Sequence, residues 1–196
     1  MIFSENGDNF MKRTATLIAT VALMLNLGVA SVYAQQNVKM TSSGNVVPST
    51  INLVPNTNTD DFNLAGKGSL GPFTYRELHA DTASPQPSTT CSPGPYFRVV
   101  IGAGVFRFQD GSLMTVNITE GALCLDLTVP VGHLTVTYQI TGGTGRFKSA
   151  SGTLTLTAAL RPVLFTASGH AAFLTDTGKF EGTVSGVADE EEREDE

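Results

Sequence analysis

The chain has 196 residues, of which 41% are hydrophobic and only 15% charged, and its formal net charge is −6. The C-terminal segment 189–196, DEEEREDE, carries seven acids and one arginine, so it accounts for the whole of that charge and leaves the rest of the chain close to neutral. This distribution excludes the basic surface that nucleic acids and anionic membranes require. The acidic segment itself is typical of a disordered, solubilising tail.

The N-terminal segment has the pattern of a secretory signal peptide. A short basic start at residues 11–13, MKR, precedes an apolar run over 15–29, and small residues then indicate cleavage after Ala34. Met11 is an alternative start, because the first residues, MIFSENGDNF, fit poorly ahead of such a signal. The apolar run is short for a membrane span, and a retained anchor helix is the alternative interpretation. We therefore expect residues 1–34 to be removed, which leaves a secreted or periplasmic protein without a membrane span.

The next two segments differ in composition and in the pattern of their apolar residues. Residues 35–60 are rich in Asn, Ser, Thr and Pro, and we interpret them as an extended N-terminal arm that contributes one edge strand near Val46 or Ile51. Over residues 61–188, short segments of alternating apolar and polar residues recur, each bounded by Gly, Pro or Asp. This alternation, without a helical period, predicts a single all-β domain that is a barrel or a sandwich.

The segment FTYRELHA holds the candidate site. Its alternate residues share one face of the predicted strand, and they are Phe73, Tyr75, Glu77 and His79. A carboxylate and an imidazole beside aromatic rings predict acid–base catalysis by Tyr75, Glu77 and His79, since burial makes a carboxyl group suitable for proton transfer. We expect the rings of Phe73 and Tyr75 to contact a ligand. The alternative is an exposed strand face that carries a cross-strand charge pair.

The two cysteines lie in segments of different kinds. Cys91 belongs to a proline-rich, loop-like segment over residues 81–95, and Cys124 to a strand-like one. An even number of cysteines in an exported protein allows one disulfide, which would join the long loop to the sheet. Two unconnected thiols are the alternative. The sequence has no further ligands at metal-site spacing, so we expect neither a metal nor a cofactor.

The segment QITGGTGRFKSASGTLTLT, residues 139–157, places three glycines ahead of a Lys-Ser pair, as nucleotide-binding loops do. Such a loop needs Gly immediately before the lysine and a helix after it, whereas here Phe147 precedes Lys148. The residues that follow alternate between Leu and Thr, which indicates a strand. We therefore exclude nucleotide binding and predict a strand–turn–strand unit.

Within this unit, GGTGRFKSASG has the pattern Gly-Gly-Thr-Gly-x-Phe-x-x-Ala-x-Gly. It resembles the signature of the allene oxide cyclase and dirigent barrels, and of similar bacterial secreted proteins. The resemblance implies a single antiparallel eight-stranded β-barrel of the calycin type over residues 61–188, an apolar cavity for a small hydrophobic ligand, and a homo-oligomer, which is a trimer in plant members. The residues that carry the motif are Gly142, Gly143, Thr144, Gly145, Phe147 and Gly152.

The motif is suited to a barrel corner. Its glycines supply backbone conformations closed to other residues, and the ring of Phe147 is expected to pack beneath the corner. Arg146 and Lys148 are expected to point to solvent. No motif in the early strands matches the catalytic residues of these families, so no catalytic role is transferred to this chain from them.

Three functions follow from these expectations. The first is a barrel that holds a small hydrophobic molecule or assembles with copies of itself. The second is a cyclase or isomerase that acts on a hydrophobic substrate through confinement and one acid–base carboxylate. The third is a structural protein of a surface or matrix.

Overall fold

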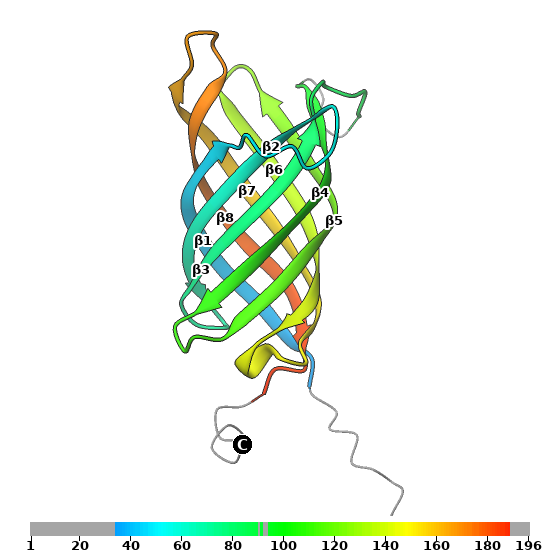
Figure 1. Ribbon diagram of the computed structural model, residues 1–196, viewed down its shortest axis with the longest axis vertical. Coiled ribbons are helices and arrows are strands. Elements are labelled where there is room, and N and C mark those ends of the chain that lie inside the picture. Colours follow the sequence, from blue (N-terminus) through cyan, green and yellow to red (C-terminus); the bar gives the residue numbers. More distant parts are fainter. Residues whose placement is uncertain (1–33, 90, 92–93, 189–196) are drawn as a thin grey trace, which may run out of the picture. The chain divides into compact units, whose positions relative to one another are not determined.

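The computed structural model describes residues 34–89, 91 and 94–188, and these form a closed antiparallel β-barrel (Figure 1). The eight strands are β1 (Gln36–Pro48), β2 (Thr57–Gly68), β3 (Phe73–Thr82), β4 (Tyr96–Phe108), β5 (Leu113–Asp126), β6 (Val131–Gly143), β7 (Ser151–Phe165) and β8 (Ala171–Ser185). Each strand pairs with the next along the chain, and β8 pairs with β1 to close the barrel. The predicted eight-stranded antiparallel barrel is therefore confirmed.

Two segments singled out in the sequence fall beyond this description. The expected signal peptide, except for Ala34, and the acidic tail over 189–196 lie outside the described residues. Within the described part, no helix has the length and the hydrophobicity to cross a membrane.

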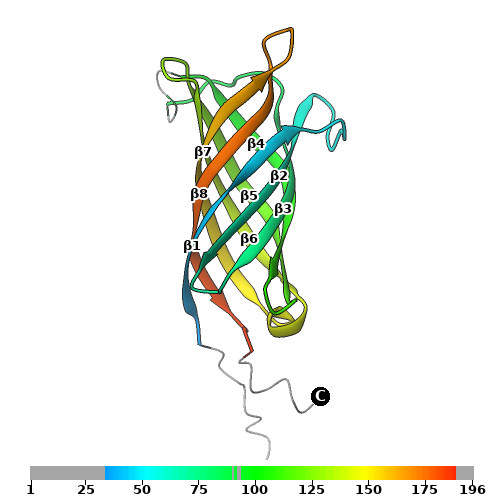
Figure 2. The same cartoon turned by 90° about the vertical axis from the view of Figure 1, so that its left-hand side faces the viewer.

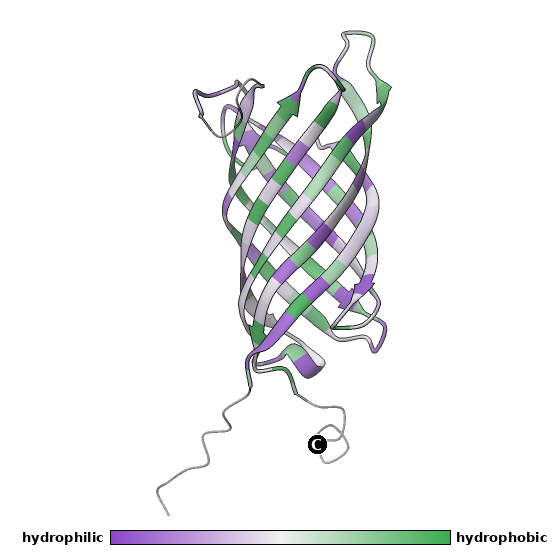
Figure 3. Cartoon of the chain, turned by 180° about the vertical axis from the view of Figure 1, so that it is seen from behind, coloured by the Kyte–Doolittle hydropathy of each residue, from purple (hydrophilic) through white to green (hydrophobic). Residues whose placement is uncertain are grey.

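Alternation along the strands fills the interior with apolar side chains. In β6 the inward positions are buried while the residues between them are polar and largely exposed, and the inward ones are Leu134, Val136, Tyr138 and Ile140. Figure 3 shows the same alternation of hydrophilic and hydrophobic bands along neighbouring strands. Because successive side chains of a strand point to opposite faces, one apolar set per strand is enough to build a continuous core inside a closed sheet.

The barrel begins at Gln36 rather than at residue 61, which corrects the expected arm. Strand β1 and the first residues of β2 occupy the segment 35–60, and closure of the sheet means that neither is an edge strand. The inward face of β1 includes Ser42 and Gly44 between apolar residues, so its period of two is hidden in the sequence. Ile51 lies in the β1–β2 loop, where it is 52% exposed.

The glycine-rich motif closes the end of the barrel at which β1 begins and β8 ends (Figure 1). Strand β6 ends at Gly143, a short 3-10 helix, η1 (Gly145–Phe147), follows, and β7 begins at Ser151. Gly145 adopts a φ of 56°, in the left-handed region that favours glycine. Phe147 is fully buried, and its ring centroid lies 4.6 Å from that of Phe108. An aromatic plug therefore fills this end of the barrel.

Arg146 does not point to solvent as expected. Its Nε forms an ion pair with Asp110 at 3.2 Å, and its guanidinium donates a hydrogen bond to the carbonyl oxygen of Leu70. The guanidinium carbon also lies 4.6 Å from the centroid of the Phe147 ring and 5.0 Å from that of Phe108. These contacts fix the corner against the neighbouring turns, because a guanidinium over an aromatic face is attracted to the ring electrons.

The opposite end carries the long loops, over residues 49–56 and 83–95, and the shorter ones at 127–130 and 166–170 (Figure 2). Cys91 lies in the 83–95 loop and Cys124 near the end of β5. Their sulfur atoms lie at disulfide-bonding distance, with the Cα atoms 5.3 Å apart. The contact joins the long loop to the sheet.

Replacing both cysteines by serine is expected to lower the free energy of unfolding by about 2–4 kcal/mol, because the bridge restricts the unfolded chain across a separation of 33 residues. Urea unfolding followed by circular dichroism measures the change. Dithiothreitol should lower the stability of the wild type to that of the double variant and leave the variant unaffected. A wild-type stability that is insensitive to reductant would mean that the thiols are free.

Candidate functional site

Strand β3 carries the candidate residues on its inner face. Phe73, Tyr75, Glu77 and His79 are 4%, 0%, 2% and 2% exposed, respectively. The alternative of an exposed strand face is therefore wrong. The residues between them behave in the opposite way: Arg76 points outward and forms an ion pair with Asp61 at 2.9 Å.

Glu77 lies at the centre of a buried hydrogen-bond network. Its Oε2 accepts hydrogen bonds from the hydroxyl groups of Tyr75 and Tyr138, the latter at 2.8 Å. Its Oε1 lies 2.6 Å from Nδ1 of His79. Tyr138 belongs to β6, three strands away from β3 around the barrel, so the network connects two distant parts of the wall through the interior.

The surroundings set the protonation of the network. Burial, followed by the charge of Glu77, raises the pKa of Tyr75 and Tyr138 well above the ordinary value, so both hydroxyl groups stay protonated and donate. Burial alone would lower the pKa of His79, but its hydrogen bond with Glu77 and the charges of Glu77, Asp60 and Asp81 outweigh burial and raise it. We therefore treat Glu77 and His79 as a buried ion pair with two phenolic donors.

Two glycines of β4 make room for these side chains. Gly104 and Gly102 lie opposite Glu77 and His79 in the β3–β4 ladder. A Cβ atom at Gly104 would lie 2.3 Å from the hydroxyl oxygen of Tyr75, and one at Gly102 would lie 2.5 Å from Cβ of His79. Larger residues therefore do not fit. Sequence reasoning missed this role, although the small residues in VVIGAGV alternate with the same period of two.

Asp176 joins the interior from β8. It is 1% exposed, and neither oxygen of its carboxylate has a hydrogen-bond partner. Burial, and then the charge of Glu77, raises the pKa of Asp176 to about 7. A carboxylate in this setting ionises only at a cost, so the residue is held as an acid up to near-neutral pH.

Asp60 and Asp81 extend the acidic set toward the loop-bearing end. Asp60 lies opposite His79 in the β2–β3 ladder, and Asp81 lies two residues after His79 on β3. Burial, and then the charge of Asp60, raises the pKa of Asp81 to about 6, and burial raises that of Asp60. Sequence reasoning also missed these aspartates, because both fall in polar stretches near strand ends where no apolar pattern marks an inward position.

A cavity of about 610 Å³ lies above this set, in the mouth of the barrel. Asp60 and Asp81 line it together with the 48–52 segment at the end of β1 and in its loop. Its apolar wall is formed by Phe97, Leu123, Leu125 and Leu174. By strand register, Asp176 is the next inward residue below Leu174 on β8. We name this space the mouth cavity.

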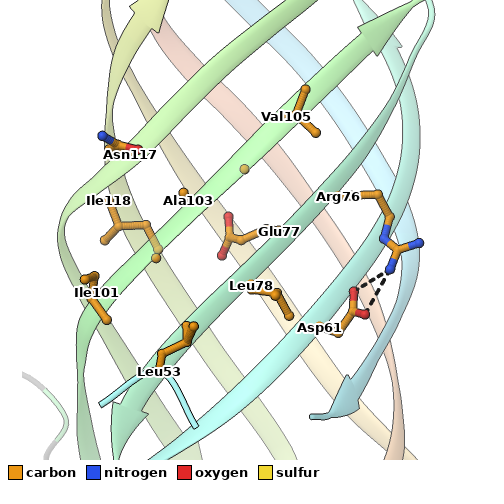
Figure 4. A pocket seen from close by; sticks show the side chains of 12 residues that line it. Leu53, Asp61, Arg76, Glu77, Leu78, Ile101, Ala103, Val105, Asn117 and Ile118 are labelled. Carbon is orange, nitrogen blue, oxygen red and sulfur yellow. Dashed lines mark hydrogen bonds and ion pairs between the residues drawn. The ribbon is translucent and has the colours of Figure 1, made fainter. Parts of the chain in front are cut away.

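A second hollow, of about 750 Å³, lies on the outer face of β3, β4 and β5 (Figure 4). Leu53, Leu78, Ile101 and Val105 line it, with the Arg76–Asp61 ion pair on one side. Glu77 is among the residues that line it, but its carboxylate accepts hydrogen bonds from tyrosines of the interior core. Asp60 and Asp81, whose pKa values are raised, line the mouth cavity instead, and Asp176 lies below it, so the mouth cavity is the better candidate for chemistry.

Phe73, predicted to contact a ligand, lies deeper in the core. Its ring packs against Phe106, Phe108 and Phe180, with the centroids of Phe73 and Phe106 5.3 Å apart. It does not line the mouth cavity, and neither does Tyr75. Among the described residues, no group of three or more His, Cys, Asp or Glu side chains is arranged to hold a metal ion.

No protein-family model matches this chain, and no curated protein has a significantly similar sequence. The resemblance to the allene oxide cyclase and dirigent barrels therefore rests on the glycine-rich motif and on a barrel with the expected number of strands.

Proposed function

We propose that this protein is an exported barrel, related to the allene oxide cyclase and dirigent group, that binds a small, largely apolar molecule in the mouth cavity. The observation that carries the proposal is the cavity of about 610 Å³ at the loop-bearing end of the barrel. This volume falls in the range of small-molecule sites, about 300–1,000 Å³. The ligand enters from this end, because Phe147 and Phe108 fill the other one.

The composition of the wall supports the same proposal. Leucine and phenylalanine side chains offer apolar contact to most of a ligand, while a few carboxyl groups give it an orientation. Sites for small molecules are commonly built in this way, with a mainly hydrophobic lining and a small number of placed polar groups. A space of this kind also argues against a purely structural role for the barrel.

Export is supported by two observations. The signal-peptide pattern over residues 1–34 directs the chain out of the cytoplasm. The cysteine sulfurs at bonding distance suit an oxidising compartment, where disulfides persist.

Binding in the mouth cavity can be measured with the neutral apolar dye N-phenyl-1-naphthylamine, whose fluorescence rises on burial. Leu123→Trp is expected to weaken dye binding at least about tenfold, because the indole fills space that the dye would occupy. The control is Val163→Trp, which places the same side chain at a position on β7 that is 60% exposed. Equal dye affinity for both variants, or no dye binding to the wild type, would contradict the proposal.

The second candidate function is a cyclase or isomerase with an acid–base group. It is favoured by the meeting of Tyr75, Glu77 and His79 in one network, as the sequence pattern suggested. Enzymes often tune a buried carboxylate in this manner. Binding alone remains our first proposal, because the carboxylate of Glu77 is closed off from solvent and does not line the mouth cavity.

A further inference from the structure

The interior of the barrel carries more acids than bases. The inward-facing acids among the described residues of the site are Asp60, Glu77, Asp81 and Asp176, and the inward base is His79. His79 is already paired with Glu77. The charge of His79 also acts on Asp60 and Asp81, but among the described residues none of the three aspartates forms an ion pair. No lysine or arginine lines the mouth cavity.

Two of these aspartates also have unused hydrogen-bond acceptors. Oδ1 of Asp81 is buried without a hydrogen-bond partner, and the whole residue is 4% exposed. Both carboxylate oxygens of Asp176, which lies below the cavity, are also buried without a hydrogen-bond partner. A buried polar atom without a partner is costly, and a donor brought by a ligand removes that cost. Burial raises the pKa of Asp81 and of Asp176, and a neighbouring acid raises each further, whereas the charge of His79 lowers that of Asp81.

We infer that the mouth cavity takes an amphipathic organic cation, namely a protonated amine with an apolar body, whose ammonium group is held by Asp60 and Asp81. The inference rests on the proposed function and specifies the class of ligand. An ammonium group donates up to three hydrogen bonds and accepts none, which matches a pair of carboxylates. The apolar body of the amine packs on Leu123, Leu125 and Leu174.

Anions and metal ions fit the cavity less well than an organic cation does. An anion would meet Asp60 and Asp81, so it would be repelled. The one basic residue among the described residues that line the cavity is His170, which lies exposed in the 166–170 loop and not on the inner wall. A metal ion needs several converging ligands, and no such group is formed within the described part of the chain. The apolar wall has no role in holding a bare ion, whereas it supplies most of the contact to an organic one.

Three compounds of nearly equal shape test the charge directly. Tryptamine carries an ammonium group, 3-ethylindole is neutral, and indole-3-propionate is an anion. With the full chain, isothermal titration calorimetry is expected to show tryptamine binding at least about tenfold more tightly than 3-ethylindole, and the anion more weakly than either. Tryptamine affinity should also increase from about pH 5 to about pH 7.5, as Asp81 ionises.

Substitutions of single aspartates show whether binding of the ammonium group depends on the carboxylates in the cavity or only on the overall charge of the barrel. Asp81→Asn and Asp60→Asn are each expected to weaken tryptamine binding at least about fivefold and to change 3-ethylindole binding less than about twofold. Asp61→Asn is the matched control, because it removes the same charge from the adjacent, outward-facing position that pairs with Arg76. It should leave the affinity for tryptamine close to that of the wild type.

The outcomes distinguish the two proposals. If tryptamine and 3-ethylindole bind equally, or if Asp61→Asn loses as much tryptamine affinity as the other two variants, the ligand is not a cation. The proposal that the barrel binds a small apolar molecule would still hold. Tight binding of calcium chloride alone, lost in Asp81→Asn, assigns the site to a metal ion instead. If neither the indoles nor N-phenyl-1-naphthylamine binds, both proposals fail.

Discussion

Replacing Glu77 by alanine is expected to lower the free energy of unfolding by about 3–5 kcal/mol, as found when one partner of a buried ion pair is removed. The carboxylate is the acceptor for the hydroxyl groups of Tyr75 and Tyr138 and the partner of His79. All three groups would remain in a core closed to water, where an unmatched donor keeps its full desolvation cost. Urea unfolding of the variant and the wild type near neutral pH measures the difference.

Two controls accompany this substitution. Glu77→Gln keeps the shape and one acceptor oxygen, so its cost should be smaller than that of alanine. Glu120→Ala removes a glutamate from the surface of β5, where it accepts a hydrogen bond from Thr137, and should change stability by less than about 0.5 kcal/mol. If alanine at position 77 costs no more than alanine at position 120, the network does not stabilise the barrel.

Glu77→Gln also separates the two candidate functions. A catalytic carboxylate that becomes an amide loses its capacity for proton transfer, while a ligand in the mouth cavity keeps its contacts with the apolar wall. Dye binding that is retained together with lost turnover of a substrate would favour the cyclase or isomerase. Retained binding and unchanged turnover would show that Glu77 is not the acid–base group.

The sequence predicts most of the barrel because alternation is a local property. Inward and outward residues of β6 can be separated from TVTYQIT alone, and a closed sheet needs such a pattern in every strand. β1 departs from this pattern, since Ser42 and Gly44 stand at inward positions where the pattern requires apolar residues, and β8 departs from it at Asp176. The place of β1 in the barrel is set by pairing with β2 and β8, which the local sequence does not contain.

The site is predictable only in part. The shared face of Tyr75, Glu77 and His79 follows from the strand period, but the sequence does not say whether that face points inward. The direction depends on space provided by Gly102 and Gly104 in the neighbouring strand. Tyr138 lies 61 residues from Glu77, so no local pattern connects the two.

Asp176→Asn is expected to reduce the dependence of stability on pH. Folding raises the pKa of this carboxyl group from 3.8 to about 7. Between these values the folded state binds more protons than the unfolded chain, so the free energy of unfolding falls as the pH rises. The contribution of Asp176 is fully lost above about pH 7, and a change of this size corresponds to about 4 kcal/mol.

The charge of Glu77 reinforces this direction, because it raises the pKa of Asp176 further. Glu77 and Tyr138 are the ionisable groups that interact with it, and the residues opposite it in the two ladders are Gly44 and Leu160, which do not titrate. His79 contributes with the same sign, because its raised pKa gives stability that is present at low pH and lost as the pH rises through the folded-state value.

Urea unfolding of the wild type and of Asp176→Asn at about pH 4, 6 and 8 tests the expectation. At each pH, the free energy of unfolding of the variant is compared with that of the wild type. The test is how this difference changes from the lowest to the highest pH, because the cost of burying the amide is the same at every pH. The variant should gain on the wild type by on the order of 2–4 kcal/mol as the pH rises, whereas Asp61→Asn, on the outer face, should not. Parallel curves for the wild type and Asp176→Asn would mean that this aspartate is ionised inside the folded barrel at acidic pH, and so has a partner there.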